Sequence, residues 1–376
     1  MSLRHYLLVA AVGALVTLLV TPLVRHIALA RGLVDTPGGR KVHATPIPRL
    51  GGVAIFAGVM AALAAQAAGE IYLDWGGTLV EGGTARVRIL GVVVAMTVIF
   101  LVGLIDDLIT MSPGFKLLGQ VVAAGIAIAS GLEIAYVGNP AGSGLLSLGL
   151  LGVPVTLLYI VGFTNVINLI DGLDGLAAGV TGIAAVSLLL LAAQANRLEA
   201  AALAAAVIGV CAAFLFFNFN PASIFMGDSG ALFLGFTLSA ISLMGVMKST
   251  ATIALAVPLL IIGVPIFDTA SAIVRRVLHR RPIQEADRGH IHHKLLGRGF
   301  NQKQTVLIIY VWCAALAIGG YTLRWAGGPF KIGAFVVLFV VTGFMAYWLG
   351  LFEAAHQAED ESGAKLREGN RMRPSK

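Results

Sequence analysis

Charged residues are scarce in this chain. Only 12% of its 376 residues are Asp, Glu, Lys or Arg, whereas 58% are hydrophobic. A soluble domain carries about a quarter charged residues, so this composition excludes a soluble globular protein. The formal net charge of +7 does not point to nucleic acid, because the basic residues of membrane proteins collect in cytoplasmic loops. We therefore expect an integral membrane protein with no nucleic-acid partner.

Cysteine is also rare. Cys211 and Cys313 each lie alone inside an apolar run. Their number excludes a disulfide framework and their spacing excludes a thiolate metal site, so we interpret both as packing residues. A cleavable leader is not expected either, because the first apolar run, 6–29, is long enough to span a bilayer.

Long apolar runs, in contrast, fill the chain. A transmembrane helix needs about 20 mostly apolar residues. By that criterion the sequence predicts about eleven spans, near 6–29, 50–69, 87–105, 116–131, 145–164, 176–194, 200–217, 230–247, 251–272, 304–323 and 332–352. We therefore predict an all-α integral membrane protein, a polytopic bundle in which 1–352 form a single transmembrane domain.

Basic residues set the expected orientation. With the N-terminus outside, 19 of the 26 lysines and arginines fall in the inner regions, which are 25–49, 106–116, 165–175, 218–230, 273–303 and 353–376. The positive-inside rule therefore predicts an outer N-terminus and a cytoplasmic C-terminus. The last of these regions, 353–376, alternates acidic and basic residues, so we expect a solvated, mobile tail there.

Two neighbouring carboxylates end the third predicted span. Asp106 and Asp107 are followed by Pro113-Gly114, which indicates that the helix stops there. A charge at membrane depth is costly, so carboxylates kept there are functional candidates. Neighbouring side chains on a helix point about 100° apart, so the pair could face one metal ion only at a helix end. The alternative is a polar helix cap wetted by the cytosol.

A second motif, NVINLIDGLDG, repeats a polar residue at every third position, namely Asn165, Asn168, Asp171 and Asp174. A continuous helix would fan these side chains across about half of its circumference. A break at the two glycines of the motif would let them converge. Asn and Asp oxygens are hard ligands that suit Mg²⁺. The alternative is polar pairing between helices.

A third motif, FMGDSG, places Asp228 between two glycines, directly before an apolar run. Glycines let a phosphate approach backbone N–H groups, and a helix that starts after Asp228 would direct its positive dipole end at an anion. The alternative is an ordinary loop. Ser229 is not expected to be a nucleophile, because no G-x-S-x-G elbow surrounds it.

The inner loop 273–303 carries His290, His292 and His293 in the string EADRGHIHHK. Their spacing is poor for a zinc site on one helix. Together with Arg288 and the other basic residues of the loop, they suit a polyanion through charge-assisted bonds to phosphate oxygens. The alternative is a basic loop with incidental histidines.

Three further features are ambiguous in the sequence. Lys116 could offset the charge of the neighbouring aspartates or hold a phosphate. The proline-stiffened segment 31–52 carries basic residues that could contact anionic lipid heads or serve only as a juxtamembrane anchor, namely Arg40, Lys41, His43 and Arg49. Asp268 lies inside the ninth predicted span, where we expect it to pair with Arg275 or Arg276.

Six stretches, in order from residue 35 to 294, carry a family resemblance: DTPGGRKVHATPIPRLGG, LIDDL, NVINLIDGLDGLAAG, NPASIFMGDSGALFLG, PIFDTASAIVRR and ADRGHIHHKL. They resemble the polyprenyl-phosphate N-acetylhexosamine-1-phosphate transferases, and the HIHH string is similar to the GlcNAc-1-phosphate branch. The resemblance implies that the phosphate of undecaprenyl phosphate attacks the sugar-linked phosphorus of a UDP-sugar, here UDP-GlcNAc, and releases UMP. It also implies a multi-pass protein of the bacterial inner membrane whose active site faces the cytoplasm.

The resemblance also implies roles for individual residues. Asn168 and Asp228 resemble ligands of a catalytic Mg²⁺, which Mn²⁺ could replace. Asp106 and Asp107 resemble the residues that position or deprotonate the lipid phosphate, and Asp228 joins them as a catalytic residue. Substrate contacts are implied for Lys116, Asn165, Asp171, Asp174, Arg288, His290, His292 and His293, and contacts to the lipid phosphate for Arg40, Lys41 and His43.

Other functions stay open at this point. A phospho-MurNAc-pentapeptide transferase belongs to the same group. An intramembrane prenyltransferase would also use Asp-rich, Mg²⁺-dependent sites, but 106–110 lacks the second acid of a DxxxD motif. A transporter would place polar residues near the bilayer midplane, often with repeat symmetry, and neither is visible. The expected partners are UDP-GlcNAc, undecaprenyl phosphate and membrane lipids, and a homodimer is compatible with the sequence.

Overall fold

The computed structural model describes residues 3–35, 46–73, 75, 89–138, 145–246, 259–260, 262–278, 290–322 and 328–349. Several predicted features lie outside these residues, namely Arg40, Lys41, His43, Arg288 and the tail 353–376. Within them, nearly the whole chain is helical. The helices are α1 (Leu3–Ala30), α2 (Gly51–Tyr72), α3 (Ile89–Ile109), α4 (Pro113–Ala129), α5 (Gly152–Ile170), α6 (Leu176–Gln194), α7 (Leu198–Asn218), α8 (Gly227–Val246), α10 (Gly263–Leu278), α11 (Ile291–Gly297), α12 (Gln302–Thr322) and α13 (Gly328–Trp348).

Two short antiparallel hairpins interrupt the helical pattern. β1 (Val34–Asp35) pairs with β2 (Ile47–Pro48), with Val34 opposite Pro48 and Asp35 opposite Ile47. β3 (Tyr136–Gly138) pairs with β4 (Leu145–Ser147), and the 3₁₀ turn η1 (Gly149–Leu151) leads from β4 into α5. The first hairpin brings the chain from the end of α1 to the start of α2.

Among the described residues, eight helices are long and apolar enough to cross a membrane, namely α1, α2, α3, α5, α6, α7, α8 and α12. α4 is apolar but shorter, and α13 contains a shorter apolar stretch, 333–348. These helices confirm the predicted all-α polytopic membrane protein. The number of eleven spans and the orientation stay predictions.

Two predicted span boundaries are wrong. The prediction starts a span at residue 145, but β4 and η1 occupy the first part of that run, so α5 begins at Gly152 and continues to Ile170. The prediction also ends the ninth span at 272, whereas α10 continues to Leu278, and its Arg275 and Arg276 are buried. Hydropathy reports the polarity of side chains, so it does not register a strand pairing or a buried arginine.

α8 is the centre of the bundle. α3 and α5 pack along it most extensively, and α2, α6 and α7 also contact it. Its side chains from Ala231 to Met244 are buried, and a helix without an exposed polar face packs on all sides. The first turn of α8 is therefore accessible only between the ends of its neighbours.

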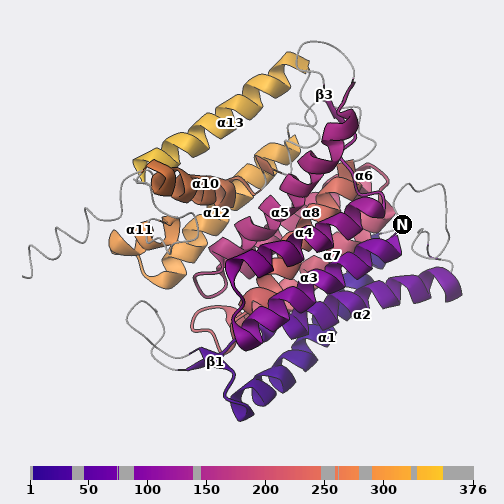
Figure 1. Cartoon of the computed structure of the whole chain (residues 1–376), viewed down its shortest axis with the longest axis vertical. Helices are drawn as coiled ribbons and strands as arrows, with labels where there is room; N and C mark the ends of the chain where they lie inside the picture. The colour runs from indigo at the N-terminus through magenta and orange to yellow at the C-terminus, as the bar shows by residue number, and fades with distance from the viewer. Residues whose placement is uncertain are drawn as a thin grey trace, which may run out of the picture.

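The loops that carry the polar motifs gather at one end of this bundle. Figure 1 shows β1 and α11 at the end opposite the N-terminus, where the orange α11 lies beside the start of α12. α3, α5 and α7 end there, and α2, α6 and α8 begin there. On one flank α10 packs against α13, α5 and α12. The bundle thus presents the ends of many helices to one common space.

Backbone contacts fix the first turn of α8 between α2 and α3. A Cβ atom at Gly103 of α3 would lie 2.5 Å from the Asp228 carbonyl oxygen and 2.6 Å from Ser229 Cα. A Cβ atom at Gly52 of α2 would lie 2.2 Å from the Gly230 nitrogen. Since real Cβ atoms do not approach this closely, only glycine allows both helices to reach α8 here.

We expect Gly103→Ala to lower the midpoint of thermal unfolding, because the added methyl group has to displace backbone rather than a flexible side chain. Overpacking of this kind costs about 1–3 kcal/mol. Gly125→Ala in α4 is the matched control, because nothing lies within 4 Å of its Cβ position, and it should be neutral or slightly stabilising. Thermal scans of detergent-purified protein measure both variants, and equal midpoints would contradict a tight α3–α8 contact.

Candidate active site

A cavity of about 690 Å³ opens at the end of the bundle where the polar motifs gather. Its walls come from the ends of α3, α5 and α7, the start of α8, the first hairpin, α11 and the start of α12. Most of the predicted site residues that the structure describes line it, namely Asp106, Asp107, Asn168, Asp171, Asp174, Asp228, His292 and His293. The fold therefore brings together side chains that lie far apart in the sequence.

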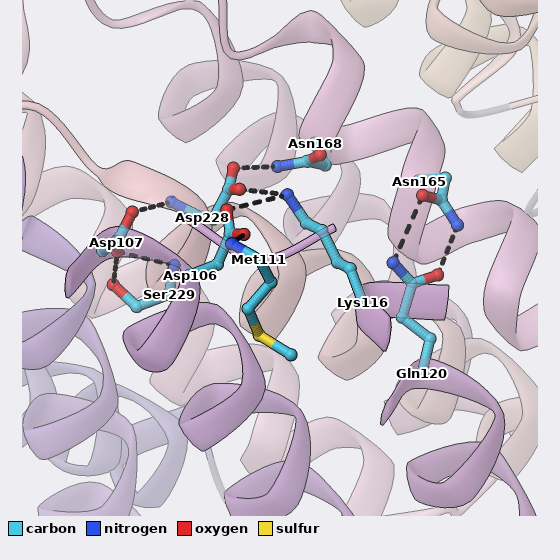
Figure 2. A network of polar contacts seen from close by, with 9 residues as sticks. All are labelled: Asp106, Asp107, Met111, Lys116, Gln120, Asn165, Asn168, Asp228 and Ser229. Carbon is cyan, nitrogen blue, oxygen red and sulfur yellow. Dashed lines mark hydrogen bonds and ion pairs between the residues drawn. The ribbon is translucent and has the colours of Figure 1, made fainter. Parts of the chain in front are cut away.

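Asp107 holds the first turn of α8. Its carboxylate accepts hydrogen bonds from the backbone N–H of Asp228 at 2.8 Å, the N–H of Ser229 at 2.9 Å and the Ser229 hydroxyl at 2.6 Å (Figure 2). These N–H groups have no partner inside their own helix, and the positive end of the helix dipole favours a carboxylate there. Asp107 thus caps α8 from a neighbouring helix and fixes the position of Asp228.

Gly227 makes this capping contact possible. Its φ of +71° lies in the left-handed region that favours glycine. A Cβ atom at this position would lie 2.4 Å from the Arg49 carbonyl oxygen and 2.6 Å from Asp107 Oδ2. Any other residue would push the Asp107 carboxylate away from the start of α8.

Lys116 links two of the carboxylates. Its ammonium group forms an ion pair with Asp228 Oδ2 and lies 3.3 Å from Asp106 Oδ2 (Figure 2). Asn168 Nδ2 donates to the other Asp228 oxygen at 2.7 Å, and the backbone N–H of Met111 donates to Asp106 Oδ1 at 2.7 Å. One cation and two N–H donors therefore offset the repulsion between Asp106 and Asp228.

Asn165 lies outside the wall of this cavity. On α5 its amide pairs with Gln120 of α4, with N···O distances of 2.5 and 3.3 Å, and its Nδ2 also donates to the Val161 carbonyl at 2.8 Å. Because α5 stays helical to Ile170, Asn165 is one helical turn further from the cavity than Asn168. Its geometry matches polar pairing between helices, the alternative that the sequence left open.

The helix that carries the motif NVINLIDGLDG ends within the motif, as predicted. α5 ends at Ile170, and Gly175, with a φ of +81°, precedes α6. Asp174 accepts hydrogen bonds from Asn220 Nδ2 at 2.9 Å and the N–H of Ala222 at 3.0 Å, so it ties this loop to the one before α8. Asp171 lines the cavity, and burial, followed by the like charges of nearby aspartates, raises the pKa of its carboxyl to about 8.

Asp268 anchors the histidine segment. Its Oδ2 lies 2.9 Å from His290 Nδ1, and its Oδ1 accepts the backbone N–H of Ile291 at 2.7 Å. Both Asp268 and His290 are buried, and neither lines the cavity. The expected pairing of Asp268 with an arginine of its own helix is therefore replaced by a contact that fixes the start of α11.

Only the second and third histidines reach the cavity. The imidazole of His292 packs on the loop after α5, where a Cβ at Gly172 would lie 3.0 Å from its Nε2. Burial, and next the charge of neighbouring His293, lowers the pKa of His292 to about 3, so its ring is neutral at physiological pH. His292 can therefore bind a ligand by hydrogen bonds but adds no positive charge.

One basic residue of the loop 273–303, Arg298, contacts α13 instead of the cavity. Arg298 donates to the Trp348 carbonyl at 2.9 Å and lies over the Trp348 ring, 4.7 Å from its centre, at the end of α13. Arg298, one of the basic residues of the loop 273–303, therefore does not line the cavity with His292 and His293. The guanidinium of Arg298 is instead engaged by Trp348 of α13.

Sequence reasoning missed the amides that connect the loops. Asn218 accepts the N–H of Gly175 at 3.0 Å and donates to the Ile224 carbonyl at 2.9 Å, and Asn220 donates to Gln302 at 2.7 Å. The string NFNP, which precedes FMGDSG, was the sequence signal that could have indicated these contacts. Its asparagines lie at the end of an apolar run, as those of NVINLIDGLDG do.

A probable undecaprenyl-phosphate N-acetylglucosaminyl 1-phosphate transferase of Bacillus subtilis (strain 168) is 38% identical over 340 residues, which cover 90% of this chain and 91% of that protein. The sequence profile of glycosyl transferase family 4 matches residues 89–246. The chain belongs to glycosyl transferase family 4. The family resemblance of the six stretches is thereby confirmed.

Other family 4 relatives carry similar names. A decaprenyl-phosphate N-acetylglucosaminephosphotransferase of Mycobacterium tuberculosis (strain ATCC 25618 / H37Rv) is 34% identical, covering 84% of this chain and 82% of its own. An undecaprenyl-phosphate alpha-N-acetylglucosaminyl 1-phosphate transferase of Yersinia pestis is 28% identical, with coverage of 79% and 78%. The family 4 match at 89–246 contains the aspartates around Lys116 and ends before Asp268 and the histidines.

We expect Asp107→Asn to destabilise the protein, because an amide accepts on one oxygen only and presents N–H groups to the N–H donors of α8. A buried donor left without an acceptor costs about 1–3 kcal/mol. Ser229→Ala is the graded control, because it removes one of the three bonds and should cost less. Thermal unfolding of the purified variants measures both, and a wild-type midpoint for Asp107→Asn would rule out the capping role.

Proposed function

We propose that this chain transfers GlcNAc-1-phosphate from UDP-GlcNAc to undecaprenyl phosphate. An oxygen of the lipid phosphate forms a bond to the sugar-linked phosphorus, the bond from that phosphorus to the bridging oxygen of UMP breaks, and UMP leaves. The product is undecaprenyl-pyrophosphoryl-GlcNAc, the first lipid-linked intermediate of a cell-surface glycan. The observation that carries this proposal is the convergence of Asp106, Asn168 and Asp228 on one cavity in a family 4 chain, with Lys116 as the ion-pair partner of the two aspartates.

The cavity suits phosphoryl transfer, a reaction that needs positioning and charge neutralisation more than covalent help from the protein. Its volume of about 690 Å³ lies in the range of small-molecule sites. Lys116, held between Asp106 and Asp228, can donate to a phosphate oxygen from a fixed position. Neutral His292 and its neighbour His293 are suited to hydrogen-bond the sugar or the nucleotide.

A divalent cation fits the donor set of this site. Asp228 and Asn168, with Asp171 nearby on the same cavity, offer hard oxygens, and Mg²⁺ is typically held by one or two carboxylates together with substrate phosphates and water. In the described part of the chain, no three His, Cys, Asp or Glu side chains form a metal cage, so a bound cation would share its coordination with the substrate. It would neutralise charge on the diphosphate and on the leaving UMP.

The lipid phosphate does not need a strong base. Its second pKa is about 6, so it is largely ionised at neutral pH. Asp106, which accepts the Met111 N–H and lies beside Lys116, can orient this phosphate without removing a proton. We therefore favour direct attack by the lipid phosphate over a covalent aspartyl-phosphate intermediate.

The location of the site follows from the charge distribution. The basic loops at this end predict that it faces the cytoplasm, and a bacterial inner membrane would supply undecaprenyl phosphate there. The relatives that share this family act, by their names, on polyprenyl phosphates. In this proposal a lipid acceptor and a water-soluble donor meet at the membrane boundary.

Release of UMP tests the proposal. Purified protein with undecaprenyl phosphate and Mg²⁺ should release UMP from UDP-GlcNAc and less from UDP-MurNAc-pentapeptide. A preference for the pentapeptide donor would reassign the sugar, and pyrophosphate release from a prenyl donor would point to a prenyltransferase. The absence of any product with every donor would refute an enzyme of this class.

We expect Asp228→Asn to lower the turnover number by at least about 100-fold, the usual scale for one preorganised electrostatic group. The substituted amide keeps the size of the side chain but removes the charge that faces Lys116 and the proposed cation. The control is the thermal midpoint, which should fall less than in Asp107→Asn, because Asp107 bonds the backbone of residue 228 and only the contacts with Lys116 and Asn168 change. Normal turnover would remove Asp228 from the catalytic group.

We expect Mg²⁺ binding to tighten as the pH rises toward 8. Since burial raises the pKa of Asp171 to about 8, its carboxyl is mostly protonated at pH 7 and has to lose that proton before it can help to hold a cation. The ionised fraction grows about fivefold between pH 7 and pH 8, and calorimetry should register a similar gain in affinity. Asp171→Asn should flatten this dependence, and a flat wild-type profile would exclude Asp171 as a ligand.

A further inference from the structure

Arg49 occupies a fixed place on the cavity wall. The chain around it is tied to the segment before Asp228, because the N–H of Phe225 donates to the Pro48 carbonyl at 2.7 Å and the N–H of Gly51 donates to the Phe225 carbonyl at 2.9 Å. Its own carbonyl is pressed against Gly227. The backbone of Arg49 is therefore positioned by the same loop that positions Asp228.

The guanidinium of Arg49 has no partner among the described residues. Its Nε is buried without a hydrogen bond, although six aspartates line the same cavity. A buried donor without an acceptor costs about 1–3 kcal/mol, so such a group calls for an explanation. Nearby Arg25, in contrast, donates its Nε to the Ser223 carbonyl at 3.1 Å.

Other positive groups at the site are already engaged or neutral. Lys116 is held by Asp106 and Asp228, and burial keeps the His292 ring uncharged at neutral pH. Among the described lysines and arginines, Arg49 alone lines the cavity. Arg49 is therefore the one among these described residues that an anion entering this cavity of aspartates meets.

We propose that Arg49 binds a phosphate group of a substrate. The planar guanidinium fork matches two phosphate oxygens, and such charge-assisted pairs are the strong hydrogen bonds of proteins. The sequence alone allowed a contact with lipid head groups or a plain anchor, but a partly buried side chain on the cavity wall faces the reactants instead. This inference rests on the proposed function, in which either the UDP diphosphate or the lipid monophosphate supplies the anion.

Binding of two probes to the full-length purified protein tests the inference without turnover. UDP represents the donor, and a short-chain prenyl monophosphate represents the acceptor, each measured by calorimetry with Mg²⁺ present. Arg49→Gln should weaken one probe by at least tenfold, which corresponds to about 1.4 kcal/mol. Loss for UDP alone would assign Arg49 to the donor, and loss for the prenyl phosphate alone would assign it to the acceptor.

Arg31→Gln is the matched control, because Arg31 is exposed at the end of α1 and does not line the cavity. Wild-type affinity of Arg49→Gln for both probes, or an equal loss in Arg31→Gln, would overturn the inference. If Arg49→Gln fails to fold, Arg49→Met, which also removes the charge, replaces it, and affinities equal to wild type for both probes would again overturn the inference. If Arg49→Gln binds a probe more weakly than the wild type does, but the wild type releases no UMP, the proposed function is refuted and the phosphate contact of Arg49 stands.

Discussion

The hydrogen bonds between Asp107 and the first turn of α8 are the constraint on which the site depends. They join a carboxylate at the end of one helix to two backbone N–H groups at the start of another. Gly103 and Gly227 leave the space that this contact requires. Because the side chains from Ala231 to Met244 are buried, the half-buried first turn is the part of α8 that presents a side chain to the cavity, and Asp228 is that side chain.

The electrostatics of the cavity follow from this anchor. Helix N–H groups stabilise the Asp107 carboxylate by hydrogen bonds, and the positive charge of Lys116 offsets the negative charges of Asp106 and Asp228. The carboxylates can therefore lie close together. The loop contacts of Asp174 and the link between Asp268 and His290 then fix the surrounding walls. The result is a fixed set of oxygen donors and an Arg49 guanidinium that has no partner among the described residues. On this set rests the proposed binding of a phosphate together with a divalent cation.

Much of this arrangement could be predicted from the sequence. Apolar runs long enough to span a bilayer gave the fold class, and the aspartates at their ends indicated that the site lies at one end of the bundle. The boundaries at 145 and 272 were wrong, since hydropathy does not register the β3–β4 pairing or the buried arginines of α10. The contacts of Asn165 and His290 could not be predicted from the sequence motifs, because a motif gives neighbours in the chain rather than neighbours in space.

The sequence by itself determined the membrane class, the family and the residue types available for chemistry, because these depend on composition and on local strings. Only the tertiary structure decided how those residues divide their work. Asp106 and Asp107 are adjacent in the chain, yet one lies beside Lys116 and the other caps α8, because their side chains leave the helix in different directions. Arg49 became a candidate only when its surroundings revealed a buried donor without an acceptor.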